Sequence, residues 1–199
     1  MKIIVIGGTG LIGKAVVERL KSTHQVLSVG FDDGDYHVNI EDIQSIRSLF
    51  KEVGKLDAII MTTGNVVFKP LNEMTENDFM IGLKSKVMGQ INTAIEGIPY
   101  LNDNGVITLT SGILNEDPIY QGTGAAVVNG AIDGFVKAAS IDLPRGIRIN
   151  AVSPTVILEA MPSYEPYFRG FEAVPVQKVA NTFLKSTEGK LTGHVFHVI

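Results

Sequence analysis

The hydrophobic residues of the chain recur with two different periods along most of its length. Residues 2–6 form a continuous β-branched run that stops at a glycine pair, which is typical of a strand buried on both faces of a parallel sheet. Leu11, Val16 and Leu20 then follow at helical spacing with charged residues between them. A second apolar run covers residues 25–29, so the chain is predicted to open with a strand, a helix and a second strand.

The same alternation predicts the remaining elements. It indicates strands over residues 36–38, 58–61, 105–109, 148–152 and 195–199, and helices over 42–52, 75–98, 124–143 and 176–184. The helix over 75–98 is expected to be one long helix. Roughly seven strands separated by helices, without repeats or a linker, predict a Rossmann-type doubly wound α/β fold with a mostly parallel sheet and helices on both faces. With 199 residues, the chain is expected to form a single domain over residues 1–199.

Composition excludes several classes of function. The 17 basic and 21 acidic residues give a net charge of -4 and form no basic cluster, so nucleic acid is not an expected partner. The absence of cysteine excludes disulfides, thiolate metal sites and cysteine nucleophiles, and with only four scattered histidines no metal site is expected. The apolar run at the start is too short for a signal peptide or a membrane span, which predicts a cytoplasmic protein that does not contact membranes.

A glycine-rich turn joins the first predicted strand to the first predicted helix. Backbone N–H groups and the helix dipole converge at such a turn and favour a pyrophosphate, so the turn is expected to bind a dinucleotide. Thr9 within it either caps the helix or contacts phosphate. The residues of the turn assigned to the cofactor are Gly7, Thr9, Gly10, Leu11, Ile12 and Gly13.

The end of the second strand determines which ribose is accepted, because an acidic side chain there binds a free 2'-hydroxyl and a basic one binds a 2'-phosphate. Phe31 and Asp32 occupy this place and are assigned to the cofactor site. Asp32 either favours NAD or belongs to a solvated turn, so the expected cofactor is NAD or NADP.

Several stretches together resemble the short-chain dehydrogenase/reductase family over essentially the whole chain. The turn GGTGLIG resembles the family's cofactor turn, and Asn39 and Ile40 resemble its adenine-contacting pair. Thr63 and Gly64 stand where the family has its Asn-Ala-Gly stretch. Residues 106–111 (VITLTS) resemble its serine strand, and residues 148–154 (RINAVSP) resemble the segment before the nicotinamide-side loop, which here is Pro154, Thr155 and Val156.

The resemblance implies hydride transfer between a nicotinamide cofactor and a carbonyl or alcohol, with Ser111 polarising the substrate oxygen. It also implies a small-molecule substrate and a homodimer or homotetramer. The family's tyrosine and lysine, which lie one turn apart on the helix after the serine strand, are missing. Alignment places Ala125 and Asn129 at their positions. It places Lys86 where the family carries an active-site asparagine, so lysine and asparagine have exchanged places.

Two side chains are candidates for the missing acid. Lys86 is one, if it is desolvated beside the nicotinamide, although a lysine extending from a helix into solvent fits the same pattern. Tyr120 is the other, and packing at the substrate entrance is the alternative for it. Residues 157–171 resemble a short lid over an apolar pocket.

Three functions are compatible with these residues. The first is an NAD(P)-dependent oxidoreductase with a rearranged proton relay built from Ser111, Lys86, Tyr120 and Asn129. The second is an NAD(P)-binding sensor or interaction protein without dehydrogenase turnover. The third is a lyase, isomerase or epimerase that uses the nucleotide transiently.

Overall fold

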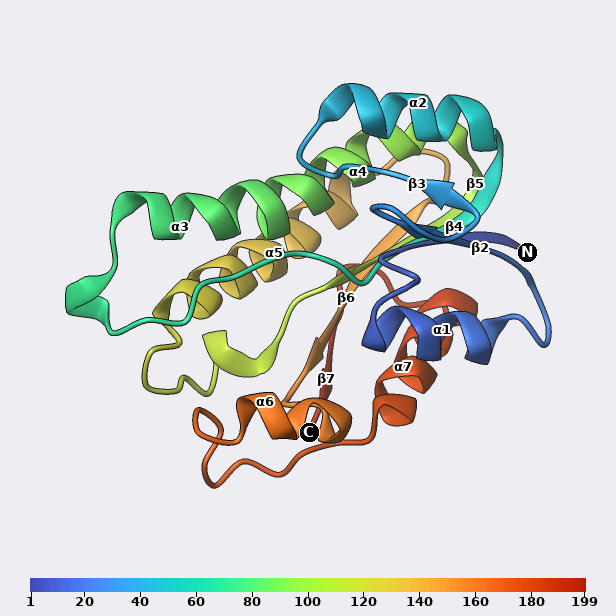
Figure 1. Cartoon of the computed structure of the whole chain (residues 1–199). Helices are drawn as coiled ribbons and strands as arrows, with labels where there is room; N and C mark the ends of the chain where they lie inside the picture. Colours follow the sequence, from blue (N-terminus) through green and yellow to red (C-terminus); the bar gives the residue numbers. More distant parts are fainter.

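The computed structural model describes residues 1–199 and is built around a seven-stranded sheet in which every strand pair is parallel (Figure 1). The strand order is β3-β2-β1-β4-β5-β6-β7, which confirms the predicted Rossmann-type fold. The strands are β1 Lys2–Ile6, β2 Gln25–Gly30, β3 Tyr36–His37, β4 Leu56–Met61, β5 Leu101–Thr110, β6 Arg148–Pro154 and β7 Val195–Val198.

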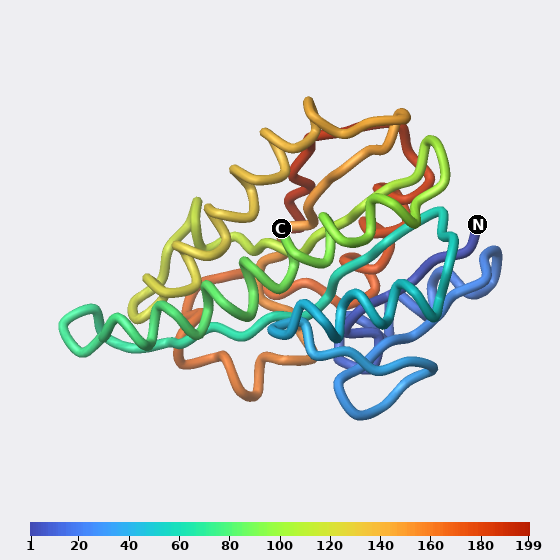
Figure 2. The backbone as a smooth tube through the Cα atoms, turned by 90° about the horizontal axis from the view of Figure 1, so that it is seen from above, coloured from blue at the N-terminus to red at the C-terminus, as the bar shows by residue number.

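Helices cover both faces of this sheet, as predicted, and form a three-layered molecule (Figures 1 and 2). Helices α2, α4 and α5 contribute to the apolar core on one face, and α1 and α7 to the core on the other. The helices are α1 Leu11–Leu20, α2 Ile43–Val53, α3 Glu76–Gly82, α4 Gly89–Gly97, α5 Thr123–Asp142, α6 Met161–Tyr164 and α7 Val176–Glu188. None of them is long and apolar enough to cross a membrane.

Burial on both faces explains the continuous apolar runs of the central strands. In β1, Ile4 and Ile6 point into the core beneath α2 and α5, while Ile3 and Val5 point into the core beneath α1 and α7. All four side chains are at most 1% exposed. An alternating polar pattern would place polar groups in one of these cores without partners, so the strands are apolar at every position.

The helix predicted over residues 75–98 is continuous over residues 76–97 but includes a π-helical turn that the sequence did not predict. Helix α3 begins after a capping box between Thr75 and Asp78, and a π-helical turn, Leu83–Met88, separates it from α4. The wider turn lets Ser85 and Lys86 both face the loop that follows β4: the Ser85 hydroxyl accepts the N–H of Asn65 at 3.1 Å, and Gly64 lies against Lys86. Periodicity in the sequence cannot reveal this π-helical turn, because contacts with a distant loop accompany it.

The glycine turn brings α1 closer to β1 than any side chain permits. A Cβ atom on Gly13 would lie 1.9 Å from the carbonyl oxygen of Gly7 and 2.7 Å from the Cα of Gly8. The turn and the first helical residues therefore occupy one compact unit. This unit lies at the carboxyl end of β1, between β2 and β4, where the strand order changes direction.

Replacing Gly13 by Ala should destabilise the protein by about 3 kcal/mol or more, because backbone atoms rather than flexible side chains must move. The control is Gly134→Ala, at an exposed position inside α5 with no atom within 4 Å of the added carbon. This control should stabilise the chain by roughly 0.5–1 kcal/mol. Urea unfolding of the two variants measures both effects, and equal stabilities would contradict the argument.

Candidate functional site

Two adjoining cavities open at the carboxyl ends of the strands. The first, here called the apolar cavity, has a volume of about 430 Å³, and the second, the polar cavity, about 550 Å³. Thr62 and Thr63, which follow β4, line both and lie between them. Because both cavities meet at the point where the strand order changes direction, they occupy the usual ligand crevice of an open α/β sheet.

The polar cavity contains the glycine turn and the end of β2. Gly7, Thr9 and Gly10 line it, and Gly7 has a φ of 85° and lies against the backbone of Thr62. No side chain caps the N-terminus of α1. The first N–H groups of this ten-residue helix therefore remain available, and an anion such as a pyrophosphate fits them without displacing a protein group.

Thr9 does not cap the helix, so the capping alternative is wrong. The hydroxyl oxygen of Thr9 lies instead beside Gly30. A Cβ atom added to Gly30 would lie 2.8 Å from this oxygen and 2.3 Å from the carboxylate of Asp33. Thr9, Gly30 and Asp33 thus pack together at the rim of the polar cavity. This contact joins the glycine turn to the loop after β2.

The remaining predicted cofactor residues divide between the two cavities. Phe31, Asp32, Asn39 and Ile40 line the polar cavity, together with Asp33 and Glu41, and no Lys or Arg is among its lining residues. Leu11, Ile12, Gly64, Pro154, Thr155 and Val156 line the apolar cavity. Gly13 is buried behind the turn and lines neither.

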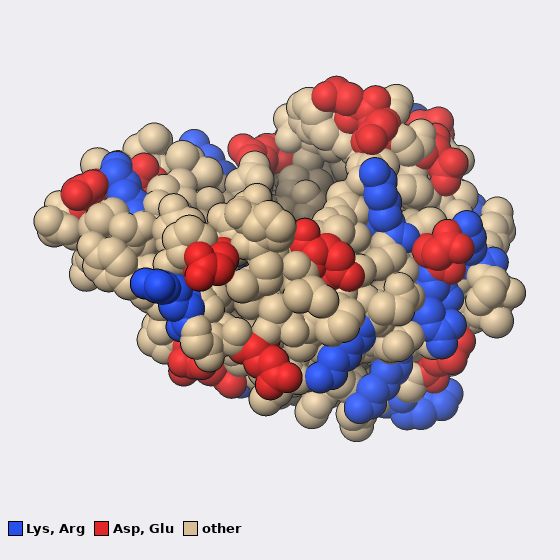
Figure 3. All heavy atoms as spheres, turned by 60° about the horizontal axis from the view of Figure 1, so that its bottom comes forward, with Lys and Arg blue, Asp and Glu red and all other residues tan.

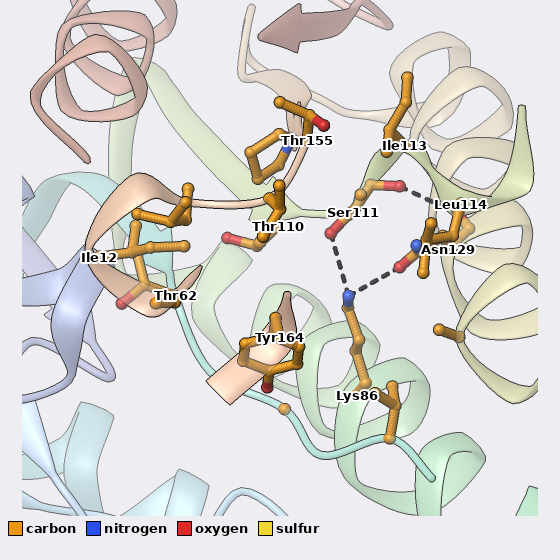
Figure 4. A pocket seen from close by; sticks show the side chains of 18 of the residues that line it. Ile12, Thr62, Lys86, Thr110, Ser111, Ile113, Leu114, Asn129, Thr155 and Tyr164 are labelled. Atoms are coloured by element: carbon orange, nitrogen blue, oxygen red, sulfur yellow. Dashed lines mark hydrogen bonds between the residues drawn. The ribbon is translucent and has the colours of Figure 1, made fainter. Parts of the chain in front are cut away.

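In the apolar cavity the structure brings together three residues that are distant in sequence (Figure 4). The Nζ of Lys86 donates to the Oδ1 of Asn129 at 2.7 Å and to the backbone oxygen of Ser111 at 3.0 Å. The Ser111 hydroxyl donates to the backbone oxygen of Asn129 at 3.2 Å. The lysine from the π-helical turn and the asparagine from α5 are therefore direct partners.

The environment of Lys86 makes its ammonium easier to deprotonate. Burial lowers the pKa of Lys86 from 10.5 to about 8, and the charge of Asp133, one turn beyond Asn129 on α5, acts in the opposite direction. At neutral pH most of the lysine is still charged, yet a proton leaves it more readily than from a solvated lysine. This behaviour suits a group that donates a proton.

Ala125 lies one turn before Asn129 on α5 and lines the same cavity. Its side chain is only 3% exposed. A methyl group neither donates nor accepts a proton, so this position supplies no acid or base to the cavity.

Tyr120 does not fill that space. It is 76% exposed and lies outside both cavities. The loop before α5 turns away at this point, with Gln121 at a φ of 66°. The prediction that Tyr120 supplies the missing acid, which rested on its closeness in sequence to α5, is therefore wrong.

Aromatic side chains close one side of the apolar cavity. Tyr164 and Phe168 come from the segment after β6 that was expected to form a lid, and Phe68 comes from the loop after β4. The ring of Phe68 lies 6.0 Å from that of Tyr164, which in turn lies 6.1 Å from that of Phe168.

On the face drawn in Figure 3, basic and acidic side chains are interspersed, and a hollow opens among uncharged atoms.

Two residues that position this site were not predicted to do so from the sequence. An added Cβ on Gly64 would lie 2.7–2.8 Å from the Cα, Cβ and Cγ atoms of Lys86, so Gly64 allows the lysine stem to pass. The fully buried amide of Gln90 accepts the N–H of Thr110 at 2.8 Å and donates to its carbonyl at 2.9 Å, which fixes the end of β5 beside Ser111. Gly64 was assigned only to the cofactor, and a single polar residue on a helix gives no signal for such a contact.

Comparisons with known proteins show similarity to reductases and dehydrogenases. A family model described as "Enoyl-(Acyl carrier protein) reductase" matches residues 8–198. The chain is 29% identical over 127 residues to the hydroxynaphthalene reductase-like protein Arp2 of Metarhizium brunneum, covering 58% of this chain and 46% of Arp2. It is 27% identical over 151 residues to the short chain dehydrogenase claC of Passalora fulva, covering 70% and 55% respectively. The chain thus spans about half the length of these curated relatives.

Two solved structures are similar over nearly their whole length. The protein lin1944 from Listeria innocua is 48% identical, with a TM-score of 0.98 and full coverage of both chains. A small-chain dehydrogenase in complex with NADPH is 25% identical, with a TM-score of 0.89, and the match covers 100% of this chain and 96% of that one.

Replacing Gly64 by Ala should displace Lys86 from its two acceptors and raise its pKa from about 8 toward 10.5, because the lysine loses part of its burial. The pH midpoint of Lys86 acetylation, followed by peptide mass spectrometry, measures this shift. Gly54→Ala is the matched control: Gly54 also has a positive φ, 71°, but no atom within 4 Å of the added carbon. Each variant should lose about 1–3 kcal/mol of stability through backbone strain. An unchanged midpoint in Gly64→Ala would show that this glycine does not position the lysine.

Proposed function

The chain belongs to the short-chain dehydrogenase/reductase family, and we propose that it is an NAD(P)-dependent oxidoreductase that acts on a carbonyl or alcohol substrate with a rearranged proton relay. The observation that carries this proposal is the position of the Lys86 ammonium, bonded to Asn129 and Ser111 inside a cavity that adjoins the glycine turn. The names of the similar proteins, which include a reductase and dehydrogenases, support it.

The residues of the two cavities fit a dinucleotide that extends across Thr62 and Thr63. The glycine turn and the free N–H groups of α1 would hold the pyrophosphate, and the polar cavity would receive the adenosine half. Val156 lines the apolar cavity, and its backbone N–H has no acceptor within the protein. This N–H is therefore available to the carboxamide group of the nicotinamide. When bound, the nicotinamide supplies or accepts the hydride.

We further propose that the cofactor is NAD rather than NADP. Asp32, Asp33 and Glu41 line the polar cavity without any basic side chain, so a 2'-phosphate would meet carboxylates and find no counter-charge. The NADPH of the solved neighbour was bound by a protein that shares 25% of its residues with this chain. A free 2'-hydroxyl suits the carboxylates as a hydrogen-bond donor.

In the proposed reduction, Ser111 and Lys86 act on the substrate oxygen. The Ser111 hydroxyl exchanges its acceptor, the backbone oxygen of Asn129, for the carbonyl oxygen and polarises it. As hydride reaches the carbonyl carbon, the electron pair of the C=O bond moves to oxygen, and the Lys86 ammonium donates its proton there. The neutral amine then recovers a proton from solvent, and Asn129 keeps it oriented throughout.

A binding protein without turnover is the second candidate, and Ala125 is the observation that favours it. The side chain that would carry the proton in the family is reduced to a methyl group that lines the cavity. A protein that only senses or presents the nucleotide would need no acid at this position. The two functions predict the same cofactor binding and differ only in turnover.

NADH should raise the thermal midpoint by several degrees, whereas NADPH at the same concentration should raise it much less. A ligand present at a hundred times its dissociation constant stabilises the folded state by about 2.7 kcal/mol. Asp32→Arg supplies the missing cation and should reverse the preference, while Asp103→Arg, at an exposed position remote from the cavities, should not. A larger shift with NADPH would refute the NAD assignment, and no shift with either nucleotide would refute the proposed function.

Reduction of carbonyl compounds should slow as the pH rises through about 8, because Lys86 must be protonated to donate. Above this point kcat/KM should fall by about tenfold for each pH unit if one proton is required. Lys86→Met should lower turnover by roughly a hundred- to ten-thousand-fold and leave NADH affinity nearly unchanged. NADH oxidation with a panel of aldehydes and ketones provides the measurement, and Lys84→Met, an exposed lysine of the same π-helical turn, is the control. Turnover that survives in Lys86→Met would exclude this lysine as the acid.

A further inference from the structure

The apolar cavity has an uneven distribution of charge. Lys86 is the only charged side chain among its 22 lining residues, 12 of which are hydrophobic. No carboxylate or histidine faces it from the lining. Any ligand of this cavity therefore meets one positive charge in an otherwise uncharged environment, where electrostatic interactions are stronger than in water.

The positive charge of Lys86 is not neutralised by direct contact. An ammonium has three N–H donors, and the two hydrogen bonds of Lys86 go to uncharged oxygens, on Ser111 and Asn129. No carboxylate lies within 4 Å of its Nζ. The carboxylate of Asp133 is 5% exposed and accepts its hydrogen bond from Asn115 at 2.7 Å. Asp133 acts on Lys86 only through its charge at a distance, so one N–H donor of the ammonium remains for a ligand.

The shape of the cavity complements this charge. At Ala125 only a methyl group lines the space, one turn from the acceptor of Lys86. The rings of Phe68, Tyr164 and Phe168 form part of the apolar wall. Flat rings pack well against planar ligands. A single ammonium suits one oxygen atom better than the two oxygens of a carboxylate, which match the two parallel N–H donors of an arginine guanidinium.

We propose that the apolar cavity binds planar aromatic or enolic compounds through an acidic hydroxyl, which Lys86 holds as its oxyanion in the space beside Ala125. The proposal rests on the proposed function because it names a class of ligand whose oxygen takes the place of the substrate oxygen in the same site. The hydroxyl proton passes to solvent on binding, while Lys86 keeps its own. The ligand oxygen then completes the hydrogen bonds of Lys86, which a tyrosine at position 125 would obstruct.

Binding of 4-nitrophenol in the presence of NAD⁺ tests this inference, because its absorbance distinguishes the phenol from the phenolate. At a pH below the probe's own pKa, the wild-type protein should bind it with a rise in phenolate absorbance. The wild-type protein should bind 4-nitroanisole, which has no acidic proton, at least about tenfold more weakly. This tenfold ratio of dissociation constants corresponds in free energy to a shift of one pKa unit. The control Lys84→Met should behave like the wild type.

Two variants separate the two parts of the proposal. Lys86→Met should abolish the phenolate signal and the preference over nitroanisole, and Ala125→Tyr should weaken binding of both probes by filling the space. Binding without ionisation, or an unchanged preference in Lys86→Met, would overturn the role of the lysine. Equal binding by Ala125→Tyr would overturn the assigned position, and this variant remains informative if Lys86→Met does not fold. Loss of probe binding with an intact NADH thermal shift would refute this inference alone, whereas loss of the NADH shift would refute the proposed function.

Discussion

The hydrogen bond from Lys86 to Asn129 is the contact around which the site is arranged. It joins the π-helical turn to α5, and the second bond of the same ammonium, to the Ser111 carbonyl, joins both to the end of β5. Gly64 lets the loop after β4 approach the lysine stem. Four segments that are remote in sequence thereby meet around one lysine side chain. Because a buried ammonium needs acceptors, this geometry is costly to disturb.

The resemblance to the family implies that lysine and asparagine have exchanged helices, which preserves one part of the family's arrangement and loses another. A hydrogen bond between an ammonium and an amide oxygen can form whichever helix carries the lysine, so the cation stays beside Ser111. The tyrosine has no such replacement, since Ala125 offers only a methyl group and Tyr120 faces solvent. The cavity therefore holds a positive charge and a hydroxyl, and at Ala125 it has a methyl group rather than an acidic side chain.

The two cavities differ in electrostatic character although they share Thr62 and Thr63. Carboxylates at the end of β2 and after β3 line the polar cavity, whereas Lys86 is the sole charge of the apolar cavity. This difference follows from the topology. The strand order changes direction beside β1, so the loops after β2 serve one side of the crevice and those after β5 and β6 serve the other. One ligand lying across both would meet opposite charges at its two ends.

The sequence by itself determined the sheet, the order of helices and strands, the glycine turn and the identity of Lys86, Asn129 and Ser111 as candidates. The sheet, the order of elements and the glycine turn depend on local periodicity and on spacing within a short motif, which are visible along the chain. The three candidate residues come from the resemblance to the family. Only the tertiary structure decided that Lys86 and Asn129 touch, that the helix around Lys86 contains a π-helical turn, that Gly64 makes room for it and that Tyr120 points away. Each of these depends on packing between segments far apart in sequence, for which the periodicity of a single segment carries no information.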